Sequence, residues 1–99
     1  CRFNFDELCN RNLGAEDYLE ITKNCKFIVI VEIPLFNNTN SDQQQRFITL
    51  LDIIHDKDIP LATTADQSLE NFTSSKSLKA PFERTISRLY DLTSREYNL

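Results

Sequence analysis

One nearly continuous run of β-branched and aromatic residues, Phe27-Ile-Val-Ile-Val-Glu-Ile33, constrains the fold of this chain more than any other segment. Pro34 follows the run directly and ends it, because proline lacks the backbone N–H that a central strand needs. A strand with one face in water alternates apolar and polar residues, whereas a strand buried on both faces is apolar throughout. The run therefore predicts a central strand of a parallel sheet that helices cover on both faces.

The residues after this strand predict a second strand and the helix that connects the two. We expect a helix near residues 42–55 and a capping box at its start, formed by Ser41 and Gln44. A second short strand is expected near residues 59–65. Strand, helix and strand with tight connections form a right-handed βαβ unit. The apolar stripe that predicts the helix repeats every 3.6 residues and consists of Phe47, Leu50, Leu51 and Ile54.

The amino-terminal quarter predicts a short strand and two short helices. Residues 2–5 alternate polar and apolar side chains, and Asp6 is suited to cap a brief helical turn after them. A second helix is expected over about residues 15–23, behind Gly14, the only glycine of the chain. The inner side of this second helix is expected to carry Tyr18, Leu19 and either Ile21 or Thr22.

The last segment predicts an amphipathic helix near residues 81–95. Pro81 suits the first helical position, and apolar residues follow at the i, i+4, i+7 spacing of one buried face. Residues 66–72 are expected to form one or two helical turns before it. The sequence thus predicts one α/β domain over residues 1–99, with a small parallel sheet and a closing helix. The apolar face of this helix is expected to consist of Phe82, Ile86 and Leu89.

Composition limits the classes of function that are open to this chain. Its 99 residues carry a net charge of -4, which argues against a nucleic-acid-binding surface. No apolar run approaches the length of a membrane span. The three cysteines are an odd number without a CxxC pair, and we interpret them as reduced small hydrophobic residues instead of metal ligands or a disulfide framework. The chain has no Met and begins with Cys1, so we expect it to be a piece of a longer protein.

Two arginines of the closing helix are the main candidates for a functional site. Arg84 and Arg88 lie one helical turn apart, and Asp91 and Arg95 continue the same row. One interpretation is an exposed ion ladder, which contributes a few tenths of a kcal/mol per pair. The other interpretation is a pair of guanidinium groups that detects phosphate charge. The spacing of the residues is compatible with both.

Arg46 is the third candidate, and two further groups carry a structural interpretation. A cation in the first turn of a helix opposes the helix dipole by about 0.3–1 kcal/mol, so Arg46 either pairs with Asp42 one turn earlier or serves a function. Glu32, at the end of the apolar strand, superficially resembles an acid of a nucleotide site. His55 follows Asp52 by three residues, as an acid–base pair would. We interpret Glu32 and His55 as structural residues.

A series of motifs, taken in their order along the chain, resembles one protein family. The motifs are Phe5-Asp-Glu-Leu-Cys9, Leu13-Gly-Ala-Glu-Asp-Tyr-Leu19, Ile33-Pro34, Arg46-Phe-Ile-Thr-Leu-Leu-Asp52 and Phe82-Glu-Arg-Thr-Ile-Ser-Arg-Leu89. This series is similar to the carboxy-terminal part of the ZapE-type AAA+ ATPases, which include bacterial cell-division-associated proteins and mitochondrial relatives. The resemblance covers essentially the whole chain. The sequence departs from the family at Cys25, where relatives tend to have an aromatic residue, and at Leu92, where they tend to have Met.

The resemblance implies a longer parent protein, a P-loop ATPase that binds and hydrolyses ATP with Mg²⁺. It implies coupling to cell division or protein quality control, and a place in the bacterial cytoplasm, at the inner membrane face or division site, or in mitochondria. The implied partner is the upstream ATPase core of the same chain, with a homo-oligomer and a protein client left open, and with no nucleic acid or membrane insertion. Arg88, Arg84 and Arg46 would then sense phosphate or act in trans on a neighbour's nucleotide, as a finger arginine worth ~10³ in rate does.

The chain alone is not expected to be an ATPase. The phosphate-binding motif G-x-x-x-x-G-K-[ST] is absent from the sequence, and one glycine cannot build a loop whose backbone amides hold phosphates. We therefore expect no nucleotide, cofactor or metal to bind to these residues by themselves. The alternative is a stand-alone protein–protein interaction domain, with its acidic surface and the loop Asn37–Asn40 as contact sites.

Overall fold

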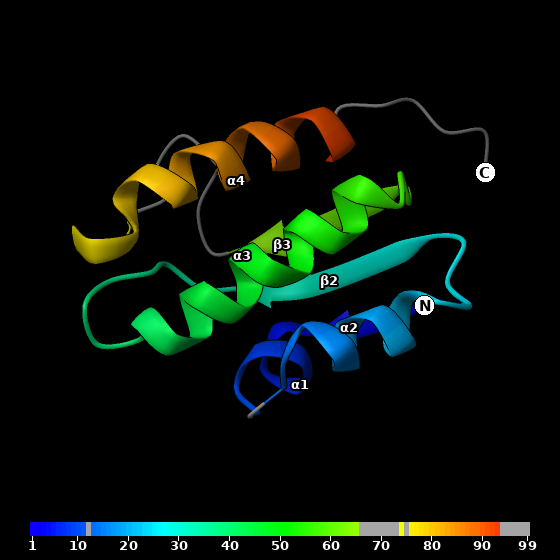
Figure 1. Ribbon diagram of the computed structural model, residues 1–99, viewed down its shortest axis with the longest axis horizontal. Coiled ribbons are helices and arrows are strands. Elements are labelled where there is room, and N and C mark those ends of the chain that lie inside the picture. Colours follow the sequence, from blue (N-terminus) through cyan, green and yellow to red (C-terminus); the bar gives the residue numbers. More distant parts are fainter. Residues whose placement is uncertain (12, 66–73, 75, 94–99) are drawn as a thin grey trace.

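Three parallel strands, four α-helices and a short 3₁₀ helix make up the described part of the chain (Figure 1). The computed structural model describes residues 1–11, 13–65, 74 and 76–93. The predicted α/β class, the βαβ unit and the closing helix are confirmed. The turns expected at residues 66–72 and the last two residues of the predicted helix lie outside the described residues. In chain order the elements are β1 (Arg2–Asn4), α1 (Phe5–Cys9), α2 (Ala15–Thr22), β2 (Ile28–Ile33), α3 (Ser41–Asp56), β3 (Leu61–Ala65), the short 3₁₀ helix η2 (Lys76–Leu78) and α4 (Lys79–Thr93).

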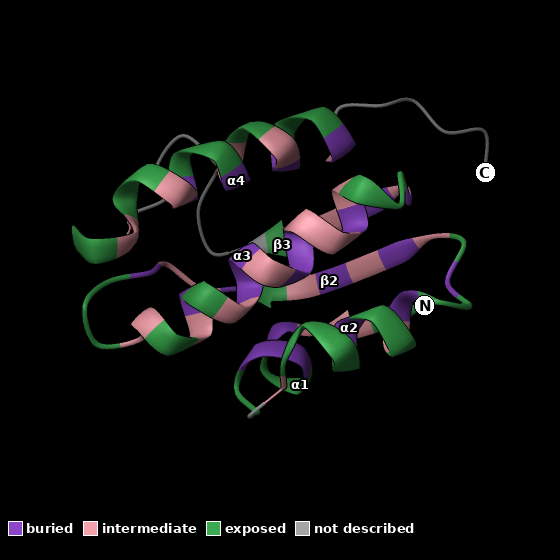
Figure 2. Ribbon diagram, in the orientation of Figure 1, coloured by how far each residue is buried: buried purple, intermediate pink, exposed green. Residues whose placement is uncertain are grey.

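The strand order is β1-β2-β3, so the apolar run forms the central strand as predicted. The four α-helices lie on one face of the sheet, the face turned to the viewer in Figure 1. Buried and partly exposed residues alternate along the first four positions of β2 (Figure 2), and the buried ones, Ile28 and Ile30, belong to the helix-covered face. Val29 and Val31 point to the opposite face and stay partly exposed. The expectation that helices cover both faces is wrong for the described residues, because their helices form a single layer.

Four phenylalanine rings lie at the centre of the helix layer. Phe36, in the loop after β2, lies 5.6 Å from Phe5 of α1 and 5.6 Å from Phe47 of α3, measured between ring centroids. It also meets Phe82 of α4 edge-on at 5.4 Å. All four side chains are at most 3% exposed. One loop residue therefore joins α1, α3 and α4 into one core.

The starts of two helices differ from the sequence prediction. Asn4 caps α1 and forms a capping box with Glu7, whereas Asp6 lies inside the helix. The same physical rule applies two residues earlier, because Asn is as good a cap as Asp. The helix α4 begins at Lys79, so Pro81 is its third residue instead of its first. Proline is tolerated there because the first N–H groups of a helix have no partner within the helix.

The other differences concern α2 and α3. Ser41 is the first residue of α3 and not its cap, so the predicted capping box with Gln44 is wrong. The Gln44 side chain is buried and its Nε2 donates to Ser74 Oγ at 2.6 Å. Tyr18 and Thr22 are the buried residues of α2, but Leu19 is 46% exposed. The longest helix is α3 with 16 residues, and none of the described helices is long and apolar enough to cross a membrane.

A disulfide joins Cys1 to Cys25, so the interpretation of all three cysteines as reduced residues is wrong. The sheet brings the two residues together: Val29 N donates to the Cys1 carbonyl at 2.8 Å, which places Cys1 beside the segment that leads into β2. The Cα atoms are 5.8 Å apart, within the range that a disulfide spans. Cys9 is free and buried.

The carboxyl end of α3 has the hydrogen bonds of a Schellman motif. Asp58 N donates to His55 O at 3.1 Å, and Ile59 N donates to Ile54 O at 3.2 Å. Asp58 adopts a φ of 55°, the left-handed conformation that glycine normally supplies at this position. A residue with a Cβ atom is disfavoured in this conformation. The turn that leads into β3 therefore holds a mild backbone strain.

This strain predicts opposite effects of glycine at two neighbouring positions. At Asp58, the Gly variant should be more stable than the Ala variant by about 1 kcal/mol, since both remove the side chain and only glycine relieves the positive φ. Lys57 has a φ of -81° and is the matched control, because Gly there should be less stable than Ala by about 0.5–1 kcal/mol. Urea unfolding followed by circular dichroism measures both differences. Equal stabilities of the Asp58→Gly and Asp58→Ala variants would contradict the assignment of strain.

Candidate functional site

The structure places one of the two α4 arginines in an ion pair with another helix. Arg88 pairs with Asp52 of α3, and the two side chains are 33% and 45% exposed. One turn further along α4, Asp91 Oδ2 lies 3.7 Å from His55 Nε2 of α3. These pairs join two helices, whereas one of the two interpretations of the sequence was an ion ladder along the closing helix alone. Arg95 of that ladder lies outside the described residues.

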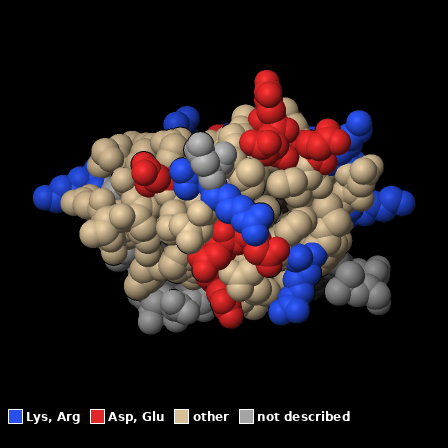
Figure 3. Space-filling model, turned by 90° about the horizontal axis from the view of Figure 1, so that it is seen from below, with Lys and Arg blue, Asp and Glu red and all other residues tan. Residues whose placement is uncertain are grey.

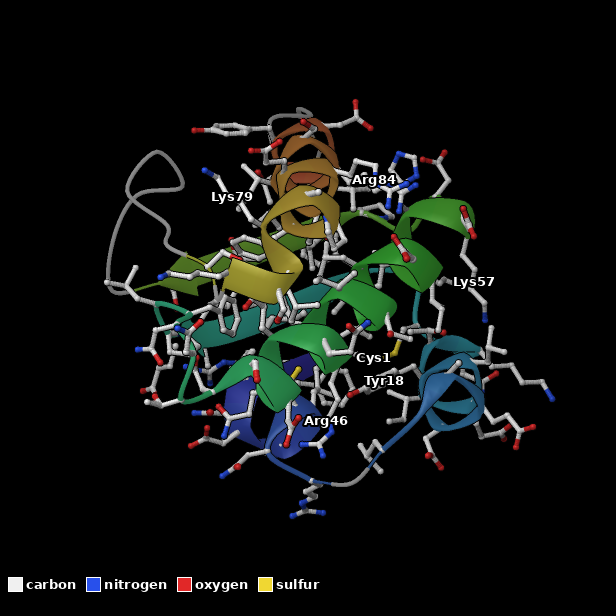
Figure 4. The ribbon with its side chains drawn as sticks, turned by 60° about the vertical axis from the view of Figure 1, so that its left-hand side comes forward. Cys1, Tyr18, Arg46, Lys57, Lys79 and Arg84 are labelled. Atoms are coloured by element: carbon white, nitrogen blue, oxygen red, sulfur yellow. A yellow bond between two sulfur atoms is a disulfide. The ribbon has the colours of Figure 1, made fainter. Side chains whose placement is uncertain are left out.

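Arg84 is exposed and differs from Arg88 in its contacts. No ion pair or hydrogen bond of its side chain is recorded in the described part of the chain. Figure 4 shows Arg84 and Lys79 on opposite flanks of α4, with Arg84 on the flank towards the carboxyl-terminal half of α3. Its guanidinium group therefore keeps its five donors available to a group from outside the described residues. The candidates Arg84 and Arg88 are neighbours on one helix but not equivalent.

Arg46 holds the end of α1. Its Nη1 donates to the Cys9 carbonyl at 3.0 Å, whereas the partner suggested by the sequence was Asp42 (Figure 4). The last carbonyls of a helix lack partners within the helix, and a cation near them is favourable. Because α3 begins at Ser41, Arg46 is its sixth residue and lies in the second turn, so the predicted first-turn position opposed to the helix dipole is wrong. The sequence could not show the partner, because the acceptor is a backbone atom.

Beside Arg46, a buried thiol and a buried phenol meet. Tyr18 Oη donates to the Leu8 carbonyl at 2.7 Å, and Cys9 is fully buried. Burial raises the pKa of the Cys9 thiol from 9.0 to about 12, while the hydrogen bond of Tyr18 and the charge of Arg46 act in the opposite direction. Burial, and then the Cys9 thiol, raise the pKa of Tyr18 above its usual value. A thiol with such a pKa stays protonated near neutral pH, so it is no nucleophile.

Glu32 stands where the carboxyl ends of the three strands meet. Its φ is 62°, its carboxylate accepts from Asn4 Nδ2 at 2.9 Å, and its N–H donates to Thr64 Oγ1 at 3.0 Å. Asn4 ends β1 and Thr64 lies near the end of β3, so the sheet topology brings the three together. Asn4 and Thr64 were not among the predicted site residues, although both lie near the ends of predicted strands. No group of three or more His, Cys, Asp or Glu suited to a metal ion occurs among the described residues.

The residues of this chain do not fit a site for ATP and Mg²⁺. Gly14 is the only glycine, and it precedes α2 with a φ of -122°, which is not the left-handed conformation of a phosphate-binding nest. Glu32 has hydrogen-bonding partners from two strands, and it belongs to no group of three or more His, Cys, Asp or Glu suited to a cation among the described residues. No catalytic step is therefore assigned to these residues by themselves.

The surface and the asparagine-rich loop bear on the alternative of an interaction domain. Acidic and basic side chains are interspersed on the face seen in Figure 3. In the loop Asn37–Asn40, Asn37 N donates to Asn40 Oδ1 at 2.8 Å, and Lys76 N donates to Asn38 Oδ1 at 3.0 Å. The loop amides thus organise the loop itself and its contact with η2. Because these amide oxygens accept hydrogen bonds from the chain itself, fewer of them are available to bind a partner protein.

The pair between Arg88 and Asp52 predicts a measurable but small coupling between α3 and α4. In a double-mutant cycle of Arg88→Gln and Asp52→Asn, the coupling free energy should be about 0.2–1 kcal/mol, because both groups are partly in water. It should shrink in ~1 M NaCl, where charges are screened. Arg84→Gln combined with Asp52→Asn is the matched control and should show additive effects. Coupling of equal size in both cycles would argue against a specific pair.

The buried Cys9 and Tyr18 predict a loss of stability at high pH. Both pKa values are raised in the folded state, so their stabilising effect is complete below about pH 9 and is lost as the pH rises towards 12. Above the unfolded-state pKa of 9.0, ionisation of Cys9 in the unfolded chain should lower the unfolding free energy by up to ~1.4 kcal/mol per pH unit.

Two variants separate these groups from the rest of the chain. In Cys9→Ala the slope of stability against pH should flatten from pH 9 upwards, and in Tyr18→Phe it should flatten from about pH 10. Urea unfolding between pH 8 and pH 11 measures both slopes. An unchanged slope in both variants would show that these groups do not stay neutral in the fold.

Comparison with known proteins gives this fold a family. The sequence model of the family described as AFG1-like ATPase matches residues 1–99. The cell division protein ZapE of Escherichia coli (strain K12) is 26% identical over 93 residues, which are 94% of this chain and 25% of that protein. Lactation elevated protein 1 homolog B of Danio rerio is 38% identical over 66 residues, which are 67% of this chain and 13% of that protein.

These matches also show how much of a relative the chain represents. The chain spans about a quarter of the length of the bacterial relative and a smaller share of the fish relative. No solved structure matches the chain. Since the family match extends over every residue, the chain belongs to the AFG1-like ATPase family.

Proposed function

We propose that this chain is the carboxy-terminal region of a ZapE-type P-loop ATPase. The observation that carries the proposal is the family match over all 99 residues, together with the quarter of ZapE that they cover. The residues that bind ATP and Mg²⁺ then belong to the remainder of that longer protein, in keeping with the absence of a phosphate-binding loop in this sequence. In this role the chain packs against the ATPase core and presents side chains to it or to a neighbouring subunit.

Arg84 is the side chain that we propose for contact with phosphate charge. Arg46 and Arg88 have partners in the chain, the Cys9 carbonyl and the Asp52 carboxylate, whereas Arg84 is exposed. An arginine placed on a rigid helix stabilises negative charge that develops on a transferred phosphoryl group. Arg88 and Arg46 remain candidates. For a role in catalysis, each would have to exchange its present partner, the Asp52 carboxylate or the Cys9 carbonyl, for phosphate oxygens.

The cellular setting is part of the same proposal. The bacterial relative is described as a cell division protein, and a role in cell division or in protein quality control is what we propose for the longer protein. The corresponding location is the bacterial cytoplasm, at the inner membrane face or division site, with mitochondria as the alternative. The ATPase core, a further copy of the protein and a protein client are the proposed partners.

The test uses the longer ATPase that contains this chain. Arg84→Ala should lower kcat for ATP hydrolysis by ~10³, with little change in thermal stability. Glu83→Ala is the matched control on the same exposed turn and should keep the activity of the parent protein. Arg88→Ala should lower stability through the lost pair with Asp52, and a kcat loss beyond that of Arg84→Ala would make it the main candidate.

Two outcomes would contradict the proposal. Unchanged turnover in Arg84→Ala would remove Arg84 from the mechanism. Binding of ATP by the isolated chain at micromolar concentration, measured by calorimetric titration, would show that the nucleotide site lies within these residues after all.

A further inference from the structure

The sheet of this chain has one face without a helix among the described residues. Parallel sheets occur almost only where both faces are covered, because their crossover helices and neighbouring layers exclude water from both sides. Here α1 to α4 form one layer on the same face (Figures 1 and 4). The physical expectation for such a sheet is a second layer on the opposite face.

The residues of the helix-free face support this expectation. Val29 and Val31 of β2 point to it, although a strand with one face in water would carry polar residues at these positions. Across the sheet, Val29 lies in register with Ala62 of β3 and with Arg2 of β1. The centre of the face is therefore apolar and partly exposed. We call this surface, defined by Val29, Val31 and Ala62, the open sheet face.

A pocket lies on the β1 side of the open sheet face. Its volume is about 250 Å³, and its lining residues are Arg2, Asn4, Glu7 and Val31. Glu32 is next to it, since its carboxylate accepts from Asn4 Nδ2 at 2.9 Å. An apolar centre with a charged pocket at one side is the pattern of an interface, in which the rim carries the polar groups.

We propose that the open sheet face is the docking surface for an amphipathic helix of the ATPase core of the longer protein. This inference rests on the proposed function. The bacterial relative is about four times as long as the part that this chain matches, so the family supplies enough chain for a second layer. Cys1 directly precedes β1 and its carbonyl accepts from Val29 N, so a segment joined to Cys1 would lie beside the sheet. The docked helix places apolar residues over Val29 and Val31.

Thiol labelling of the longer protein tests the proposal. Val31→Cys places a thiol at the centre of the open sheet face, and Glu20→Cys places one on the exposed side of α2. Under non-reducing conditions the native cysteines of this chain contribute little, because Cys9 is buried and the other two form a disulfide. The rate of maleimide modification is measured for each variant, with the label located by peptide mass spectrometry. The thiol of Val31→Cys should react at least ~10-fold more slowly than that of Glu20→Cys.

The outcomes separate the docking surface from the proposed function. Equal rates for the two variants in the longer protein would overturn the docking proposal, even if that protein hydrolyses ATP. Protection without ATP hydrolysis would support docking and overturn the proposed function. A second copy of the chain is the competing occupant: protection that depends on protein concentration, with a dimer in analytical ultracentrifugation, would overturn the intramolecular site.

A second measurement does not depend on labelling. Val31→Lys should lower the melting temperature of the longer protein, because a charge enters a buried interface. Val29→Ile is the conservative variant and should leave it nearly unchanged. An unchanged melting temperature in Val31→Lys would show that water, and not a helix, covers the open sheet face.

Discussion

The contact of Phe36 with three other phenylalanines is the interaction on which the arrangement of the helices depends. Phe36 belongs to no helix or strand, yet its ring meets rings from α1, α3 and α4. Aromatic pairs of this kind contribute about 0.5–1.5 kcal/mol each beyond the area that they bury. The loop after β2 therefore does more than connect a strand to a helix. It sets the positions at which α1 and α4, distant in sequence, lie against α3.

Around this core, the polar groups divide into a buried and an exposed set. In the corner between α1, α2 and α3, the Cys9 thiol and the Tyr18 hydroxyl are neutral, and Arg46 satisfies a helix end. Between α3 and α4, Arg88 and Asp52 form an ion pair that is partly in water. The buried groups contribute to folding, and their hydrogen bonds are made within the chain. The second set, and Arg84 beside it, is where the chain offers charge to another molecule.

Much of the fold was predictable because the determining patterns are local. The stripe of Phe47, Leu50, Leu51 and Ile54 defines α3 within one segment, and the run that ends at Pro34 defines β2. Leu19 was misplaced because α2 is short and buries only Tyr18 and Thr22. The disulfide was missed because only the pairing of β1 with β2 brings its two cysteines together.

The candidate site was less predictable than the fold. Sequence spacing identified Arg84, Arg88 and Arg46, but their partners lie on other elements or are backbone atoms. Asp52 meets Arg88 only because α3 and α4 pack side by side, and the Cys9 carbonyl leaves no trace in the sequence. Likewise, the apolar residues of β2 predicted helices on both faces of the sheet, whereas the helices of the described residues cover one face only.

The bond between Cys1 and Cys25 closes a ring of chain that contains both α1 and α2. Such a ring removes conformations from the unfolded chain, and for a sequence separation of 24 the polymer estimate is about 3.5 kcal/mol. That contribution depends on surroundings, since thiol buffers in the cytosol keep most protein cysteines reduced and oxidising compartments do not. In a reducing compartment, β1 and the two helices after it are held by their hydrogen bonds and by the hydrophobic core, to which Phe5, Leu8 and Tyr18 belong. The same sequence therefore has two stabilities, and the redox potential around it selects between them.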